Sequence, residues 1–342
     1  MSHLKFSGYR QLVLGALVIA LGFSNLLLAF PAQAATISPV RLELAADPGT
    51  TIEGEFQIYN EQKEDLVFYT QPENFEAKDE TGNPKFVGAK DGLATWIKVR
   101  SSVSVPAGER VKIPFTVSIP KEVEPGGYFS AIFLRTTPPV ETTGGEINIG
   151  SRLGPLVFLR VNGNLQENVS ILQFATKNQQ RWFNSLPVEL FYRFQNSGAD
   201  RVKPLGSIVI KNSFGLTSKT INANKTEGSV LPQSIRRFEL AWIDGNGGEQ
   251  EIKDLPASRQ PAGFFAAAKY QWDYFALGMY TANLALQYGQ DQAQSAKASF
   301  VFFIFPWQLM LLILGAIIIV FVVLRFLLKR YNNWVIAKSK NG

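Results

Sequence analysis

The side chains that most often perform covalent chemistry in proteins are almost missing from this sequence. Its 342 residues include no cysteine and one histidine, His3, close to the N-terminus. Beyond His3, thiol and imidazole nucleophiles, Cys/His zinc sites and haem ligation by these residues are therefore excluded. No phosphate-binding loop of the form G-x-x-x-x-G-K-[ST] occurs either. We expect no catalytic residue, no metal ion and no cofactor.

Carboxylates need no histidine to act as acids and bases, and they cluster at two places. One cluster comprises Glu61, Glu64 and Asp65, and the other Asp79 and Glu80. A glycosidase requires two carboxyl groups about 5–10 Å apart across a cleft, and a sequence cannot establish that distance. We interpret both clusters as solvated turns between strands, with a carboxylate hydrolase as an alternative.

A second polar stretch, DGNGGE at residues 244–249, places oxygen ligands at alternating positions and so resembles part of a calcium loop. It lacks the full spacing of such a loop, and ordinary turn chemistry explains the same residues. We interpret it as a turn and expect no bound metal.

Aromatic residues beside cations are the remaining candidates for a binding site. In TWIKVR, residues 95–100, a β-strand would direct Trp96, Lys98 and Arg100 outward, where the indole could stack on a sugar or dock a protein strand. The alternative is that Trp96 folds over the edge of the sheet. In YQWDY, residues 270–274, three aromatic residues share one face of a strand, and we expect them to pack in a core.

The elements that must position these residues are short strands. From residue 36 to 305 apolar residues recur at every second position, as in VKIPFTVSIP and ANLALQYG, and Pro, Gly, Asn and Asp interrupt the runs. This pattern predicts an all-β fold with inward and outward faces, a sandwich or a barrel. The segment FFAAAKYQW, residues 264–272, is the one place there where we expect a helical turn.

A weak internal repeat predicts two tandem immunoglobulin-like sandwiches. The segments GEFQIYN, VPAG and PGGY occur in the first half in the same order as VELFYRFQN, LPQS and LGMY in the second. We place the first sandwich at residues 35–163 and the second at 164–305.

Both ends of the chain are apolar. Residues 1–34 combine Lys5 and Arg10, an apolar run and a final A-x-A, which predicts a signal peptide, either cleaved after Ala34 or retained as an anchor. Residues 306–328 predict one transmembrane helix, because the 22 residues from Trp307 to Leu328 span about 33 Å and no charged residue occurs from Leu309 to Leu324. Residues 329–342 form a basic tail. The predicted membrane anchor residues are Trp307, Arg325, Lys329 and Arg330.

Charge indicates the orientation of this span. Five basic residues and no acidic residue occur from Arg325 onward, which is typical of a cytoplasmic end. We therefore expect a single-pass type I protein of the cell membrane, with an extracytoplasmic N-terminal region. Because the net charge of +6 is concentrated at the two ends, it does not indicate nucleic-acid binding. The absence of cysteine favours a bacterial envelope protein.

The assembled pattern resembles the WxL-interacting proteins of Gram-positive cell walls. The resemblance lies in ISPVRLELAADPGTTIEGEFQIYNE, VPAGERVKIPFTVSIPKEVEPGGYFSAIFL, FQNSGADRVKPLG and the terminal span with its basic tail. It implies a first sandwich that binds peptidoglycan, a second that binds proteins or a host, and one membrane helix.

Two functional hypotheses follow. The first is a membrane-anchored scaffold that holds cell-wall polymer (peptidoglycan) or secreted surface proteins, and the second is a chaperone-like assembly subunit of a membrane complex that exports or organises surface polymers. Both imply the lipid bilayer as a partner and strand edges as a physically available binding mode.

Overall fold

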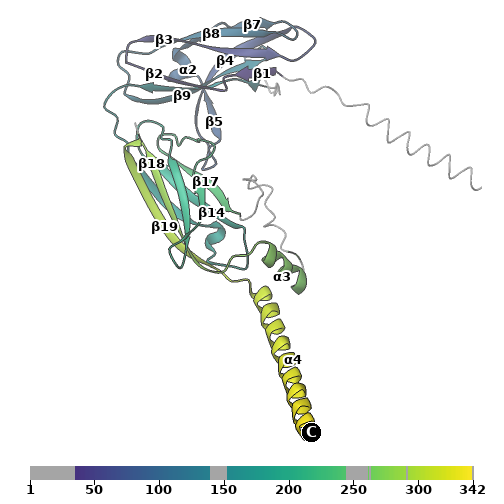
Figure 1. Cartoon of the computed structure of the whole chain (residues 1–342). Coiled ribbons are helices and arrows are strands. Elements are labelled where there is room, and N and C mark those ends of the chain that lie inside the picture. Colours follow the sequence, from purple (N-terminus) through teal and green to yellow (C-terminus); the bar gives the residue numbers. More distant parts are fainter. Residues whose placement is uncertain (1–34, 139–151, 244–260, 262, 290–291, 341–342) are drawn as a thin grey trace, which may run out of the picture.

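The computed structural model describes residues 35–138, 152–243, 261, 263–289 and 292–340 (Figure 1). The predicted signal peptide and the polar stretch at residues 244–249 lie outside these ranges. Within them the fold is all-β, with two immunoglobulin-like sandwiches followed by one long helix, so the predicted fold class is confirmed.

Two sheets form the first sandwich. One has the order β1-β3-β8-β6, and the other has the order β2-β11-β9-β4-β5, with β7 paired to β4 and β10 paired to β9. Strands β2 and β11 run parallel. The elements are β1 (Ala35–Ser38), β2 (Arg41–Ala46), β3 (Thr51–Asn60), β4 (Leu66–Ala77), β5 (Pro84–Gly88), α2 (Leu93–Trp96), β6 (Ile97–Val99), β7 (Ser102–Val105), β8 (Arg110–Ser118), β9 (Gly126–Arg135), β10 (Arg152–Leu153) and β11 (Leu156–Val161).

Two further sheets form the second sandwich, with the orders β12-β14-β17 and β13-β19-β18-β15-β16. Strands β11 and β12 lie on either side of the predicted boundary at residues 163 and 164. The elements are β12 (Val169–Thr176), the 3-10 helix η1 (Lys177–Gln179), β13 (Trp182–Phe183), β14 (Val188–Asn196), β15 (Leu205–Asn212), β16 (Thr217–Asn222), β17 (Ser234–Trp242), α3 (Phe264–Asp273), β18 (Gly278–Tyr288) and β19 (Gln294–Ile304).

Alternation along the strands produces both cores. In β8, Ile113, Phe115 and Val117 are buried, while Lys112 before them and Pro114 among them are exposed. Each fully buried residue of this size contributes roughly 1.5–3 kcal/mol relative to an exposed one. In the second sandwich, aromatic rings fill much of the core, including those of Trp242, Tyr280 and Phe302.

A buried asparagine closes β3, the first long strand of the first sandwich. The amide nitrogen of Asn60 donates to the backbone oxygens of Glu64, Val105 and Pro106 at 2.8, 3.1 and 3.2 Å, and its Oδ1 accepts from the backbone N–H of Gln62 at 3.0 Å. One side chain therefore supplies hydrogen-bond partners to backbone groups in the turn after β3 and at the end of β7. Without it these buried polar groups would be unpaired.

The same device occurs in the second sandwich. Asn196, the last residue of β14, is fully buried and donates to the backbone oxygens of Asp200 at 2.8 Å and Val230 at 3.0 Å. Its Oδ1 accepts from the N–H of Gly198 at 2.9 Å. The segments GEFQIYN and VELFYRFQN, matched in the internal repeat, end at these two asparagines.

Ion pairs and backbone hydrogen bonds join the two sandwiches. Glu80, in the turn between β4 and β5, accepts from the Nε of Arg193 at 2.8 Å, and its backbone oxygen accepts from the N–H of Arg237 at 2.7 Å. Glu43 on β2 accepts from Nη1 of Arg201 at 2.9 Å. Glu80 is therefore not only a solvated turn residue, because it links the two domains.

The long C-terminal helix α4 (Trp307–Lys340) leaves the second sandwich directly after β19 (Figure 1). Its segment Trp307–Trp334, 28 residues, is long and apolar enough to cross a membrane, and its apolar window has no buried part. At about 1.5 Å per residue it exceeds a hydrocarbon core of about 30 Å. The predicted span, residues 306–328, coincides with this helix, and the helix continues through most of the basic tail.

The expected core packing of YQWDY was wrong for Trp272 and correct for Tyr274, which packs against the core of the second sandwich. Tyr270 and Trp272 belong to the last turns of helix α3, and Trp272 is 68% exposed. Alternation over only five residues does not distinguish a strand from the end of a helix, since both leave some aromatic side chains on a common face.

We expect Asn60→Ala to lower the free energy of unfolding of the first sandwich by about 3 kcal/mol, because it leaves buried backbone groups without partners. Denaturation of the full chain in detergent, followed by tryptophan fluorescence, measures this loss. Gln57→Ala, on the outer side of the same strand, is the matched control with an expected loss below about 0.5 kcal/mol. Equal losses in the two variants would contradict the role of Asn60.

The contact between the sandwiches should weaken in acid. Hydrogen bonds from Arg193 and Arg201 lower the pKa of Glu80 and of Glu43, respectively, below its usual value. A carboxyl with a lowered pKa stabilises the contact above its ordinary pKa of about 4, and that contribution is lost as the pH falls through the lowered value. Asp200 of the second sandwich forms an ion pair of 3.6 Å with Arg160 of the first. Burial raises the pKa of Asp200, so this residue is the first of the three to lose its charge as the pH falls.

Spin labels on cysteines at Lys63 and Ser218, one in each sandwich, measure this effect as an interdomain distance distribution. We expect a narrow distribution at pH 7 that broadens below about pH 4. In the double variant Glu43→Gln with Glu80→Gln, the distance distribution should be broad both at pH 7 and below pH 4. A distribution that stays narrow in acid, or in the double variant, would show that these pairs do not hold the domains together.

Candidate binding groove on the first sandwich

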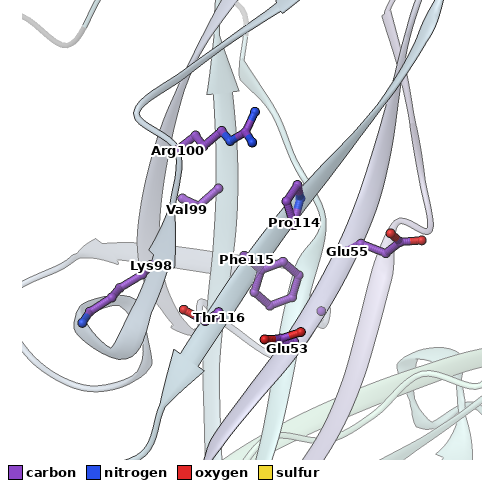
Figure 2. A pocket seen from close by; sticks show the side chains of 9 residues that line it. Glu53, Glu55, Lys98, Val99, Arg100, Pro114, Phe115 and Thr116 are labelled. Atoms are coloured by element: carbon purple, nitrogen blue, oxygen red, sulfur yellow. The ribbon is translucent and has the colours of Figure 1, made fainter.

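An open groove of about 680 Å³ lies on the first sandwich, over strands β3, β8 and β6 (Figure 2). We call it the charged groove. It is lined by Glu53, Gly54, Glu55, Lys98, Val99, Arg100, Pro114, Phe115 and Thr116. Most of its polar lining comes from the side chains that alternate with the buried residues of these strands.

Close packing of β3 on β8 shapes the floor of the groove. Gly54 is paired with Phe115, whose buried ring lies against the glycine backbone. A Cβ at position 54 would lie 2.4 Å from Cζ of this ring, closer than any non-bonded contact allows. Gly54 is therefore the residue that lets the Phe115 ring enter the core beneath the groove.

Opposite charges line the two sides of the charged groove. Figure 2 shows Glu53 and Glu55 on β3, and Lys98 and Arg100 on the opposite side. Lys112 holds Glu55 through an ion pair of 2.8 Å. The groove thus offers hydrogen-bond acceptors and donors on facing walls, which suits a ligand that carries both kinds of group, such as a polypeptide.

An incomplete strand borders the groove. Strand β6 has three residues and pairs with β8 only from Phe115 to Val117. Strand β8 pairs with β3 along its whole length down to Arg110. Within the described residues, the part of β8 from Arg110 to Pro114 therefore has a strand neighbour on one side only. Pro114 lacks a backbone donor, as is common at sheet edges.

Two of the three predicted binding residues lie in the charged groove. Lys98 and Arg100 are exposed there, but Trp96 is not in a strand, and this part of the prediction was wrong. Trp96 ends the short helix α2, and its half-buried ring packs against Tyr128 at 4.7 Å between centroids. This position corresponds to the alternative in which the indole covers the sandwich.

Sequence reasoning missed the acidic wall. Glu53 and Glu55 alternate with inward residues of β3, and this alternation was visible in the sequence. Their position opposite Lys98 depends on two pairings, of β3 with β8 and of β8 with β6. These pairings bring Glu53 and Lys98 together although they are more than forty residues apart in the sequence.

The other predicted residues occupy different places. Trp307 begins α4 and lies near Phe264 of α3, with ring centroids 6.0 Å apart, while Arg325, Lys329 and Arg330 are exposed farther along α4. Asp65 accepts from the N–H of Ala107 at 2.9 Å and so stabilises a turn. Within the described ranges, no three His, Cys, Asp or Glu side chains are placed to hold a metal ion.

No protein-family model matches the sequence, and no curated protein matches it significantly. Among solved structures, the Class 5 fimbriae chaperone CfaA is similar over 64% of this chain and 96% of its own, with 15% identity and a TM-score of 0.36. The Escherichia coli chaperone DraB is similar over 78% of this chain and 98% of its own, with 11% identity and a TM-score of 0.34. The Pseudomonas aeruginosa CupB2 chaperone has 9% identity, a TM-score of 0.34, and coverages of 78% and 100%.

Proposed function

We propose that this chain is a membrane-anchored extracytoplasmic protein that binds an extended segment of another protein along the charged groove. It would act as a scaffold or chaperone-like assembly subunit at the membrane surface. The observation that carries the proposal is the free side of β8 from Arg110 to Pro114, at the end of the short strand β6.

Strand addition explains how such a ligand would be held. An exposed edge presents backbone N–H and C=O groups that an incoming strand can pair with, which gives affinity without requiring a particular sequence. Side chains of the incoming strand that reach the charged groove would meet Lys98 and Arg100 on one wall and Glu53 on the other. These charges would select among extended segments.

Membrane attachment supports the cellular setting of this proposal. The apolar window of α4, beyond its first turn, has no cover within the described structure, and lipid is the environment that accommodates such a surface. The basic residues at its far end favour a cytoplasmic C-terminus. With that orientation, both sandwiches face the outside of the cell membrane.

Photocrosslinking in cells tests the ligand. We expect p-benzoylphenylalanine in place of Thr116, inside the groove, to capture a protease-sensitive partner, whereas the same group in place of Val87, on the other sheet, should not. Lys98→Glu with Arg100→Glu should reduce capture about tenfold, equivalent to ~1.4 kcal/mol.

The matched control reverses the charge of two exposed lysines outside the groove, in the variant Lys63→Glu with Lys90→Glu. This variant should leave capture unchanged. Equal capture from positions 116 and 87 would contradict a groove-specific ligand. Capture of a lysozyme-sensitive glycan instead of a polypeptide would replace the proposal with peptidoglycan binding, the role that the resemblance to WxL-interacting proteins implies.

A further inference from the structure

The large apolar side chains that the second sandwich exposes gather at the end where α4 begins. Six aromatic residues among them are between 48% and 88% exposed, and we call this group the aromatic collar: Trp182, Phe214, Phe265, Trp272, Phe275 and Phe305. By contrast, the exposed large apolar residues of the first sandwich are three valines, within the part of the chain that is described.

Strand register brings members of the collar together. Trp182 on β13 is opposite Phe303 on β19, and their rings stack at 4.7 Å between centroids. Phe303 is also opposite Met279 at the start of β18. The hydroxyl of Ser213 donates to the backbone oxygen of Met279 at 3.2 Å, which holds the β15–β16 hairpin tip, and with it Phe214, at this end of the sheet.

Helix α3 supplies the other part of the collar and is attached to α4. The buried side chain of Gln271 accepts from the backbone N–H of Leu309 at 3.0 Å and donates to the side chain of Gln308. It therefore satisfies one of the free N–H groups in the first turn of α4. Figure 1 shows α3 beside the start of α4, below the second sandwich.

The exposed side of α3 is suited to a boundary between water and hydrocarbon. Phe265 and Trp272 are seven residues apart, about two helical turns, and therefore share a face. Lys269 lies between them and forms an ion pair with Asp273 at 2.6 Å. Aromatic rings with neighbouring charged groups are typical of the headgroup region of a bilayer.

We propose that the aromatic collar lies in the interfacial layer of the outer leaflet of the bilayer that α4 crosses, so that the second sandwich stands on the membrane in a fixed orientation. The occupant of this surface is lipid because the collar is continuous with the span: Phe305 is two residues before Trp307, where the apolar segment begins. The inference rests on the proposed membrane placement of α4.

The hydrogen bonds of Gln271 between α3 and α4 would limit how far the sandwiches can swing relative to the membrane. If α3 were free, the single connection from Ile304 to Trp307 would let the sandwiches swing about the top of α4. The Gln271 contacts and the collar add a second attachment beside it. The charged groove of the first sandwich is then held away from the bilayer surface by the length of the second sandwich.

Depth-dependent quenching in nanodiscs tests the collar in the full-length chain. The sequence has no cysteine, so one cysteine at a time can carry an environment-sensitive fluorophore. The sites are Phe265 and Phe214 in the collar, Ile318 in the middle of the span, and Ser295 as the matched control. Ser295 is exposed near the opposite end of β19, about 30 Å from Ile304 at ~3.3 Å per residue.

We expect labels at positions 265 and 214 to be quenched at least threefold more by lipids spin-labelled near the headgroup than by lipids labelled near the chain end. The label at 318 should show the opposite preference, and the label at 295 should not be quenched by either. Quenching at 318 with unquenched labels at 265 and 214 would overturn the collar while leaving the span intact. Absence of quenching at 318 would overturn the membrane placement of α4 and the collar with it.

A second variant separates lipid contact from local packing. Gln271→Ala removes the link between α3 and α4 but keeps the exposed aromatic rings. We expect the label at Phe214, on the sandwich itself, to lose at least half of its headgroup-level quenching, whereas the label at Ile318 keeps its own. An unchanged signal at 214 would show that α3 does not fix the orientation of the sandwich.

Discussion

The exposed apolar surface of α4 is the physical constraint on which the rest of this structure depends. A helix whose apolar window has no buried part must be covered by lipid or by other apolar surface, because about 25 cal/mol is lost for each square ångström left in water. The neighbouring features agree with this requirement. The buried Gln271 caps the first turn of α4, and the exposed aromatic side chains of the second sandwich gather near that turn.

Specific hydrogen bonds and ion pairs join the two sandwiches that precede that helix. Buried asparagines at the ends of β3 and β14 satisfy backbone groups that a loop would otherwise leave unpaired, so each sandwich has a defined turn after one of these strands. Ion pairs of Glu80 and Glu43 then join one sandwich to the other. The charged groove and the free side of β8 lie on the first sandwich. The second sandwich separates them from α4 in the chain.

Local sequence signals predicted much of this fold, because burial imposes a period on each element. Alternation in β3 and β8 and the long apolar run of α4 are such signals. The errors occurred where the signal was short. Five residues around Trp272 gave a pattern common to strand and helix, and Trp96 was assigned to a strand that begins one residue later.

Only the basic wall of the charged groove could be predicted from the sequence, because the acidic wall depends on strand pairing. Lys98 and Arg100 follow one another on one segment, so their shared outward direction was visible, whereas Glu53 faces them only through the pairing of three strands. The aromatic collar is likewise assembled from β13, a hairpin tip, α3 and the end of β19. No single stretch of sequence contains enough of it to reveal a common surface.

Accessibility of single cysteines to a membrane-impermeant maleimide tests the central claim, that α4 crosses the membrane with both sandwiches outside. In intact spheroplasts, cysteine at Lys90 or Ser218 should be labelled at once, and cysteine at Asn333, beyond the basic pair Lys329 and Arg330, should be labelled only after permeabilisation. Labelling at position 333 in intact spheroplasts, or protection of positions 90 and 218, would contradict the account.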